Sequence, residues 1–235
     1  MKLALVMPTF IYRPDRRALA AAGFRTLIRT NSVREAASLI LLVKWSIADF
    51  PYPVSELSKV FHLTTIPQWA DGAAFQGVSQ PLIYGTDLAF RESADVAVHI
   101  NDDSLFHPDW LSQLEALVLR RPGARAWSVY RSAHRAVHQE LRADGPDVLV
   151  SSINGNGLAI SRAEWAAWAP RWQDHAWPDD PRDPSVLTLD YLHAQQRPGE
   201  RWVTAKSWME HTGKDGVHCR PGIPEHAVDF VGTGA

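Results

Sequence analysis

Two adjacent carboxylates, Asp102 and Asp103, are the residues whose type and position point most directly to chemistry. Like charges placed side by side repel each other, and a bound cation or a shared proton relieves the repulsion. A hard divalent ion such as Mg²⁺ or Mn²⁺ does this while bridging carboxylates to the phosphates of a substrate. Alternatively, the pair is a turn that caps the following helix. The residues alone leave both interpretations open.

The flanking residues predict where the acid pair lies in the fold. Val96 to Ile100 is a short apolar run rich in β-branched residues, which suits a buried parallel strand better than a helix. Pro108 is placed to open a helix that runs from Asp109 to Arg120. The apolar face of that helix consists of Leu111, Leu114, Leu117 and Val118. The acid pair is therefore expected in a strand-to-helix loop at the carboxyl edge of a sheet, where open α/β sheets bind ligands.

The stretch from Pro81 to Trp110 resembles the centre of GT-A-fold glycosyltransferases of the family-two type. In those enzymes a helix leads into an apolar strand that ends in a DxD-type metal motif. The motif reads Asn101-Asp102-Asp103 here, so Asn101 replaces the first acid and Asp103 matches the last. The resemblance implies an α/β fold of GT-A (Rossmann-like) type, a single domain with a mostly parallel central sheet flanked by helices. It also implies a donor half of about residues 1–110, an acceptor half of about 111–218, and a tail, 219–235.

Length, composition and charge agree with one soluble domain. A chain of 235 residues with 46% hydrophobic content can bury a substantial core, and a net charge of −2 gives no indication of broad attraction to nucleic acid. Cys219 is the only cysteine, which excludes an internal disulfide and fits a reducing compartment. No apolar run reaches the length of a membrane span, and the first residues do not resemble a signal peptide. We therefore expect a cytoplasmic protein.

The resemblance implies an activity and a set of site residues. The activity is metal-dependent transfer of a sugar, hexosyl or pentosyl, from a nucleotide diphosphate sugar to an acceptor. Pro8 and Thr9 correspond to the strand end that meets the donor's base and ribose, and Asp102 also belongs to the donor site. Asp103 and His211 correspond to the ligands of a Mn²⁺ or Mg²⁺ cofactor, with His218 in reserve.

Other residues correspond to the acceptor side of such enzymes. Asp190 is the nearest match to the general base that deprotonates the acceptor, and Asp183 is the alternative. Asn156 lies in a glycine-containing loop, Ser151 to Gly157, that corresponds to the acceptor side. Trp177, next to two acids, is a candidate for stacking on a sugar, whereas Trp165, Trp168 and Trp172 have the spacing of one packed helix face. The acceptor itself, whether glycan, small molecule, protein, lipid or modified nucleic-acid base, stays open, and so does the oligomeric state.

Two alignments of the N-terminal region are possible. In the first, Leu3 to Met7 is the first strand and Phe24 to Thr30 is the second. In the second, Leu27 to Thr30 is the first strand, and the residues before it are an addition. Both place an amphipathic helix over Val33 to Ala48. Spacing to the acid pair slightly favours the first.

The rest of the chain predicts short alternating elements. The expected strands are Val60 to Leu63, Ala124 to Tyr130 and Arg201 to Ala205, and the expected helices are Gly85 to Ser93 and Ser185 to Gln196. The polar stretch Ala133 to Asp147 is predicted to be exposed, with His138 on a solvated edge.

Two other functions compete with sugar transfer. A non-catalytic module that binds a nucleotide or glycan on the same fold is favoured by the missing first acid at Asn101. A nucleotidyltransferase is less well supported, because no glycine-rich basic loop follows the first strand. Arg13, Arg16 and Arg17 could approach a phosphate, but a solvated helix start explains at least two of them.

Overall fold

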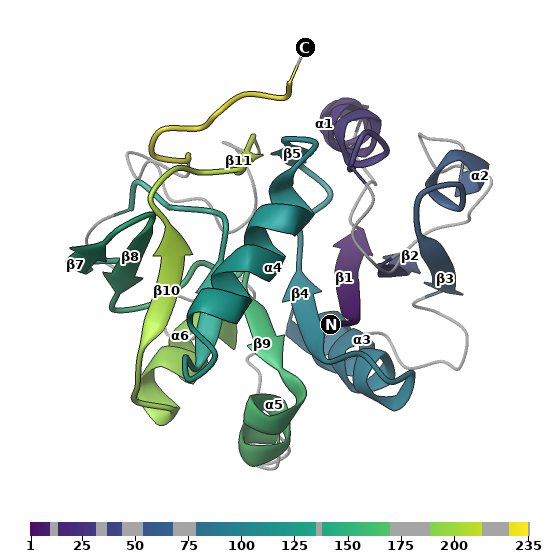
Figure 1. The fold of residues 1–235 in the computed structure, drawn as a ribbon. Coiled ribbons are helices and arrows are strands. Elements are labelled where there is room, and N and C mark those ends of the chain that lie inside the picture. The colour runs from purple at the N-terminus through teal and green to yellow at the C-terminus, as the bar shows by residue number, and fades with distance from the viewer. Residues whose placement is uncertain are drawn as a thin grey trace.

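The computed structural model describes residues 1–9, 14–31, 37–43, 54–67, 79–134, 138–169, 189–212 and 226–234 (Figure 1). The strands are β1 (Leu3–Thr9), β2 (Ser38–Val43), β3 (His62–Pro67), β4 (Val96–His99), β5 (Ser104–Phe106), β6 (Ala126–Ser128), β7 (Glu140–Asp144), β8 (Asp147–Val150), β9 (Ala159–Ser161), β10 (Arg201–Thr204) and β11 (Met209–His211). The helices are α1 (Pro14–Leu27), α2 (Val54–Leu57), α3 (Ser79–Arg91), α4 (Trp110–Arg120), α5 (Arg162–Trp168) and α6 (Leu189–Gln196).

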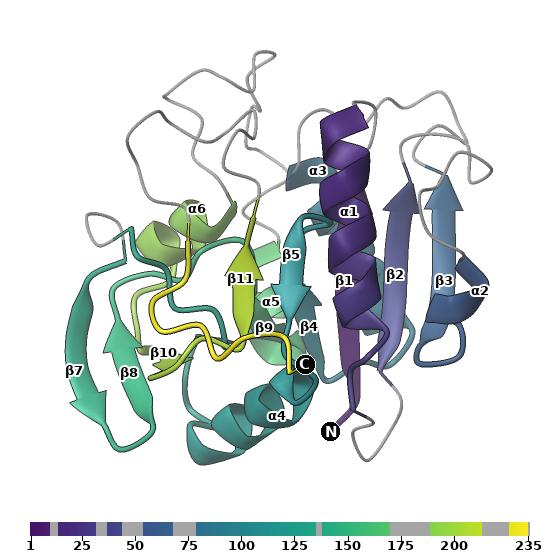
Figure 2. The same cartoon turned by 90° about the horizontal axis from the view of Figure 1, so that it is seen from above.

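Nine of the described strands form one mixed sheet in the order β3-β2-β1-β4-β9-β6-β10-β8-β7. All of them except β8 and β9 run in one direction, as the parallel and antiparallel pairings require. Figure 2 shows β3 and β7 at opposite edges of this sheet. The mostly parallel α/β fold predicted from the sequence is confirmed, with β4 among the inner strands.

The inner strands are apolar on both sides because helices cover both faces of the sheet. Every residue of β1 and of β2 is buried. Leu5 of β1 shares a core cluster with Phe24 of α1 and Trp110 of α4, whereas its neighbour Val6 clusters with Leu82 of α3 and Trp168 of α5. Successive side chains of a strand point to opposite faces, so α1 and α4 lie on one face and α3 and α5 on the other.

The N-terminal region corrects three predictions. Leu3–Thr9 is the first strand, so the alignment that begins at Leu27 is wrong. Phe24 to Leu27 lies in α1, so the second strand expected there is wrong as well. The helix predicted over Val33 to Ala48 is replaced by β2 where the structure describes it, since residues 32–36 and 44–53 lie outside the described ranges. Six buried residues, Ser38–Val43, occur in a row, and such a run fits a helical period as well as a strand buried on both faces.

Several other element boundaries also differ from prediction. Helix α3 begins at Ser79 rather than Gly85, and β3 extends to Pro67. Helix α4 begins at Trp110 with Asp109 as its N-cap, so Pro108 lies before the helix. Strands β6 and β10 lie where strands were predicted, within shorter bounds, and α6 is described from Leu189 onward. Strand β7 is exposed throughout, as expected, but His138 before it and Asp147 after it are buried, which corrects the prediction for both residues.

A separate two-stranded sheet and the C-terminal segment complete one face of the molecule. Strand β11 pairs antiparallel with β5, which directly follows the acid pair. Residues 226–234 run beside this small sheet (Figure 2), with bridges from Ala227 to Ser132 and from Phe230 to Ser207. The pairing of β11 with β5 positions residue 211 next to the loop that carries the acids. Within the described residues, no helix has the length and apolar character needed to cross a membrane.

Candidate active site

The acid pair lies in a tight loop between β4 and β5, at the carboxyl edge of the sheet. The side chains of Asp102 and Asp103 are each only 3% exposed. Helix α1 packs on the loop backbone at Gly23, where a Cβ atom would lie 2.7 Å from the carbonyl oxygens of Asp102 and Ser104. On the other side, Thr212 donates to the Asp103 carbonyl from its backbone nitrogen (3.0 Å) and its hydroxyl (2.6 Å). The loop is therefore fixed from both directions.

Asp103 and His211 are brought together, although 107 residues separate them in the chain. The pairing of β5 with β11 sets His211 opposite Ser104, and His211 Nε2 lies 3.2 Å from Asp103 Oδ1. Asp103 Oδ1 is buried and makes no hydrogen bond within the described residues, so it could accept a cation, and an imidazole with a carboxylate is a donor set that suits Mn²⁺. Within the described residues, no group of three or more His, Cys, Asp or Glu side chains is placed to hold a metal ion. A Mg²⁺-type ion commonly uses only one or two protein carboxylates and takes further oxygens from phosphates and water.

Arg16 in the first turns of α1 is a part of the site that sequence reasoning did not predict. Its Nη1 donates to Asp103 Oδ2 (2.5 Å) and its Nη2 donates to Asp102 Oδ1 (3.0 Å). The signal was present in the sequence, because Arg16 and Gly23 are seven residues apart and therefore share one face of a helix. The face that approaches the acid loop through Gly23 also carries Arg16 to it.

The electrostatics of the loop keep Asp103 ionised. Burial alone would raise the pKa of its carboxyl, but His211 and Arg16 lower it to about 2. A histidine must be neutral to bind a metal ion, and with His211 in that form the two carboxylates and one guanidinium among the described residues carry one net negative charge. The donor set therefore suits a further cation.

Asn156 connects the acid loop to the glycine-containing loop. Its Oδ1 accepts from the Asn101 backbone nitrogen (3.2 Å) and the Ser104 hydroxyl (3.1 Å), and its side chain is 2% exposed. The next residue, Gly157, has a φ of +87° and lies against Ser128, where a Cβ atom would come within 2.8 Å of the hydroxyl oxygen. Asn156 thus buttresses the acid loop in this structure, and its predicted contact with an acceptor stays a prediction.

Asp190 contacts the same loop at Gly155. It occupies the first turn of α6, and its Oδ2 accepts from the Gly155 backbone nitrogen at 3.0 Å. The hydrogen bonds of Gly155 and Asn156 thus connect the predicted base to the acid loop. The structure brings Asp102, Asp103, His211, Asn156 and Asp190 to one region of the molecule.

Two of the residues predicted to bind the donor are buried within the sheet. Pro8 and Thr9 end β1, and both are buried. The Thr9 hydroxyl donates to the Leu42 carbonyl of β2 at 3.2 Å, which fixes the strand end. Trp172, Trp177, Asp183, His218 and Cys219 lie outside the described residues, whereas Trp165 and Trp168 are buried on one helix face as expected.

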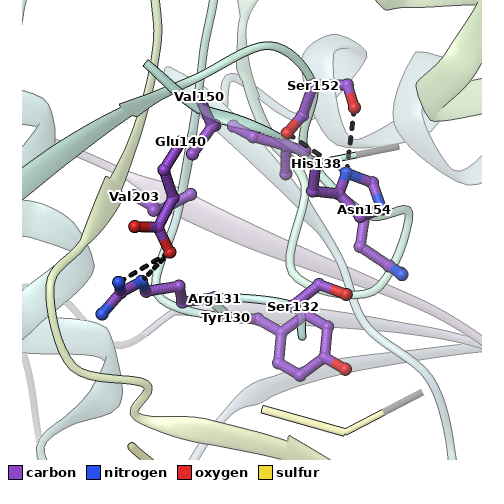
Figure 3. Close-up of a pocket in the computed structure, with 10 residues that line it drawn as sticks. Tyr130, Arg131, Ser132, His138, Glu140, Val150, Ser152, Asn154 and Val203 are labelled. Carbon is purple, nitrogen blue, oxygen red and sulfur yellow. Dashed lines mark hydrogen bonds and ion pairs between the residues drawn. The ribbon is translucent and has the colours of Figure 1, made fainter. Parts of the chain in front are cut away.

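A small pocket with both polar and apolar walls lies beside the glycine-containing loop (Figure 3). Ser152 and His138 meet there, with 2.9 Å between the hydroxyl oxygen and Nδ1, and Asn154 forms part of the wall. Arg131 and Glu140 pair at its rim with a 2.6 Å contact. His138 was predicted on a solvated edge, and its burial corrects that prediction.

Comparisons with known proteins identify the fold. No family model and no curated protein sequence matches this chain. The crystal structure of S. aureus TarS 1-349 matches with a TM-score of 0.60 at 10% identity, covering 91% of this chain and 61% of that chain. TarS 1-349 in complex with UDP-GlcNAc matches with a TM-score of 0.60 at 10% identity, covering 89% of this chain and 58% of that chain.

These matches place the chain in the GT-A-like fold. The complex of TarS 1-349 with UDP gives the same TM-score, 0.60, at 10% identity and covers 89% of this chain and 60% of that one. The chain therefore spans about three-fifths of the length of the TarS 1-349 structures that it matches. At this identity the likeness establishes the fold alone.

Proposed function

We propose that this chain is a metal-dependent glycosyltransferase that moves a sugar from a nucleotide diphosphate sugar to an acceptor hydroxyl. The observation that carries the proposal is the convergence of Asp102, Asp103 and His211 at the carboxyl edge of a GT-A-like sheet. TarS, a glycosyltransferase with the same fold, has crystal structures with UDP-GlcNAc and with UDP, which supports a nucleotide sugar as donor. The acceptor is a glycan, a small molecule, a protein or a modified nucleic-acid base.

The reaction breaks the bond between the anomeric carbon and the diphosphate oxygen, and the electron pair leaves with the diphosphate. Asp103 and His211 would hold the Mn²⁺ or Mg²⁺ ion, which when bound supplies positive charge to stabilise the leaving diphosphate. Asp103 suits this role because its pKa of about 2 keeps it fully charged at neutral pH. The rigid loop around it holds that charge in place during the reaction.

The acceptor hydroxyl forms the new bond to the anomeric carbon and must lose its proton. We assign that proton to Asp190, which is partly exposed at the start of α6 and oriented by the Gly155 backbone nitrogen. A positioned carboxylate of this kind is an effective general base. This role applies to a reaction that inverts the anomeric carbon.

A panel of nucleotide sugars, incubated with Mn²⁺ or with a chelator, tests the proposal. We expect one donor to release its nucleoside diphosphate in Mn²⁺ and not with the chelator. Asp190→Asn is expected to lower transfer at least about 100-fold while leaving the donor's dissociation constant within about twofold, because only the proton acceptor is lost. Asp144→Asn, on the exposed strand β7, serves as the matched control.

A non-catalytic module that binds a nucleotide or a glycan is the second candidate, and Asn101 favours it. This residue replaces the first acid of the motif, and its backbone is held by Asn156. In that case a nucleoside diphosphate binds and raises the melting temperature, but no donor is turned over with any acceptor. The same panel separates the two functions.

A further inference from the structure

Arg16 occupies the position of a counter-cation between the two acids. Its two terminal nitrogens bond to different carboxylates, Nη1 to Asp103 at 2.5 Å and Nη2 to Asp102 at 3.0 Å. A guanidinium that binds one carboxylate frequently does so with two nitrogens on that same partner. Here the fork is divided between two partners, as a cation bridging them would be.

Asp103 is therefore shared between two groups. Its Oδ2 accepts from Arg16, while its Oδ1 faces His211 Nε2 at 3.2 Å. A cation held by Asp103 and His211 would lie near the guanidinium, and two positive charges at that distance repel each other strongly where water is largely excluded. Occupation by Arg16 and occupation by an ion oppose each other.

The Arg16 side chain also lies close enough to solvent to move away from the two acids. Its side chain is 16% exposed, whereas both acids are 3% exposed, and it extends from the first turns of α1. The acids are fixed by the loop backbone, so the guanidinium is the one of the three charged groups that reaches solvent most easily. Two buried carboxylates without any counter-cation would repel each other, and Arg16 removes that cost when no ion is bound.

We propose that Arg16 is an internal counter-cation that competes with a divalent ion for Asp103 and so sets the ion affinity of the site. The inference rests on the metal site of the proposed function. Arg16 is a positioning residue in this scheme, because it acts on the ion through the carboxylates. It keeps the loop stable without an ion and weakens ion binding in exchange.

Direct titration of the whole chain with Mn²⁺ alone tests the proposal, with no donor present. Arg16→Gln should bind Mn²⁺ about tenfold more tightly than the parent or better, because one positive charge beside the ion is removed. Its melting temperature without Mn²⁺ should fall, and saturating Mn²⁺ should restore most of the loss. Arg17→Gln is the matched control, an exposed arginine on the next position of α1, and should leave both quantities unchanged.

Arg16→Lys keeps the proposal falsifiable if Arg16→Gln does not fold. A single ammonium cannot divide its bonds between two carboxylates as the fork does, so its Mn²⁺ affinity should lie above that of the parent. Folding of Arg16→Gln only when Mn²⁺ is added would support the proposal directly. Mn²⁺ binding equal to or weaker than that of the parent, in Arg16→Gln or in a folded Arg16→Lys, would overturn it. Absence of Mn²⁺ binding in the parent and in the variants would overturn it too.

Donor hydrolysis, measured separately, distinguishes failure of this inference from failure of the proposed function. If Arg16→Gln binds Mn²⁺ more tightly but no nucleotide sugar is turned over, the inference stands and sugar transfer is contradicted. If a donor is turned over and removal of Arg16 leaves Mn²⁺ binding unchanged, sugar transfer stands and the counter-cation is contradicted.

Discussion

Two buried charge clusters lie at opposite ends of the parallel strands, one at the amino edge and one at the carboxyl edge of the sheet. Their balances of charge are opposite. At the amino edge, Glu164 is 5% exposed and is bonded by two arginines, Arg197 at 2.6 Å and Arg125 at 2.9 Å. His193 Nε2 lies 3.3 Å from the same carboxylate. At the carboxyl edge, two carboxylates, Asp102 and Asp103, share one arginine and one histidine.

The difference in charge balance distinguishes an ion cluster whose charges are already paired from a site that can bind a cation. Burial would raise the pKa of Glu164, but the two guanidiniums bonded to it lower the pKa, and the cluster has positive charge to spare. Counted over the described residues, and with His211 neutral as a metal ligand must be, the acid loop has a deficit of positive charge, with Arg16 divided between two partners. Buried charge by itself is weak evidence of function, because paired charges also occur in purely structural clusters. The ratio of acids to cations is what marks the carboxyl edge as the place for a ligand.

The largest expected effect comes from breaking the amino-edge cluster. Glu164→Gln leaves Arg125 and Arg197 facing each other without a carboxylate, and we expect it to lower the free energy of unfolding by about 2–3 kcal/mol, because both guanidiniums are partly exposed to water. Urea denaturation measures this, with the exposed Glu92→Gln as control. The folded variant should keep the Mn²⁺ affinity of the parent. Loss of ion binding without loss of stability would mean that the two clusters have been assigned the wrong roles.

A pH titration of stability should separate the buried histidines, in an upper window, from the ion-paired carboxylates Asp103 and Glu164, in a lower one. Burial, assisted by Arg201, lowers the pKa of His193 from 6.5 to about 4, so the unfolded chain binds its proton first and stability falls as the pH drops from about 6.5 to 4. Asp103, with a pKa lowered from 3.8 to about 2, loses its contribution only below about pH 4. Each group changes stability by at most about 1.4 kcal/mol per pH unit within its window.

A second buried histidine adds to the upper window of that titration. His99 of β4 has its pKa lowered to about 3 by burial and, to a smaller degree, by the charge of His193, and its Nε2 lies 2.8 Å from the Thr86 hydroxyl oxygen. The fall between pH 6 and pH 4 should therefore correspond to the uptake of about two protons on unfolding. His193→Gln should remove about one of them and leave the lower window unchanged. An unchanged upper window in this variant would contradict the assignment.

A smaller effect is expected from changing the contact between helix α1 and the backbone of the acid loop. Gly23→Ala places a methyl group against the backbone oxygens of Asp102 and Ser104, and we expect a loss of about 1–3 kcal/mol in unfolding free energy. Because the acids shift with the loop, Mn²⁺ affinity should fall as well. Ala22→Gly, at the preceding helix position, controls for the change in helix propensity. A Gly23→Ala protein with unchanged stability and ion affinity would show that the contact is easily accommodated.

What could be predicted from the sequence was local in the chain. Strand β4, the acid loop and the start of α4 follow one another within about 15 residues, and their apolar pattern and turn signals identify them directly. The run Ser38–Val43 was misread because six consecutive buried residues satisfy both the helical and the strand period. Periodicity alone cannot separate a strand buried on both faces from a buried helix.

The charge clusters could not be predicted in the same way, because their members come from distant segments. Arg16 reaches the acids through the packing of α1 at Gly23, and His211 reaches them through the pairing of β5 with β11. Glu164 lies beside Arg197 because the chain returns to the amino edge after α6. The order of Asp103 and His211 along the chain, which the family resemblance supplied, was the one long-range signal that did point to their proximity.

The measurement that tests the central claim most directly compares the parent with Asp103→Asn and His211→Ala in the presence of Mn²⁺ and a nucleoside diphosphate such as UDP. Ligands that bind only the folded state raise its melting temperature, so the parent should show a clear rise and Mn²⁺-dependent donor hydrolysis. Both variants should lose most of the rise and nearly all of the hydrolysis, while Asp144→Asn keeps both. An Asp103→Asn protein with the full thermal shift and full activity would show that the acid pair is only a turn before α4, and the claim of a metal-dependent transferase site would be contradicted.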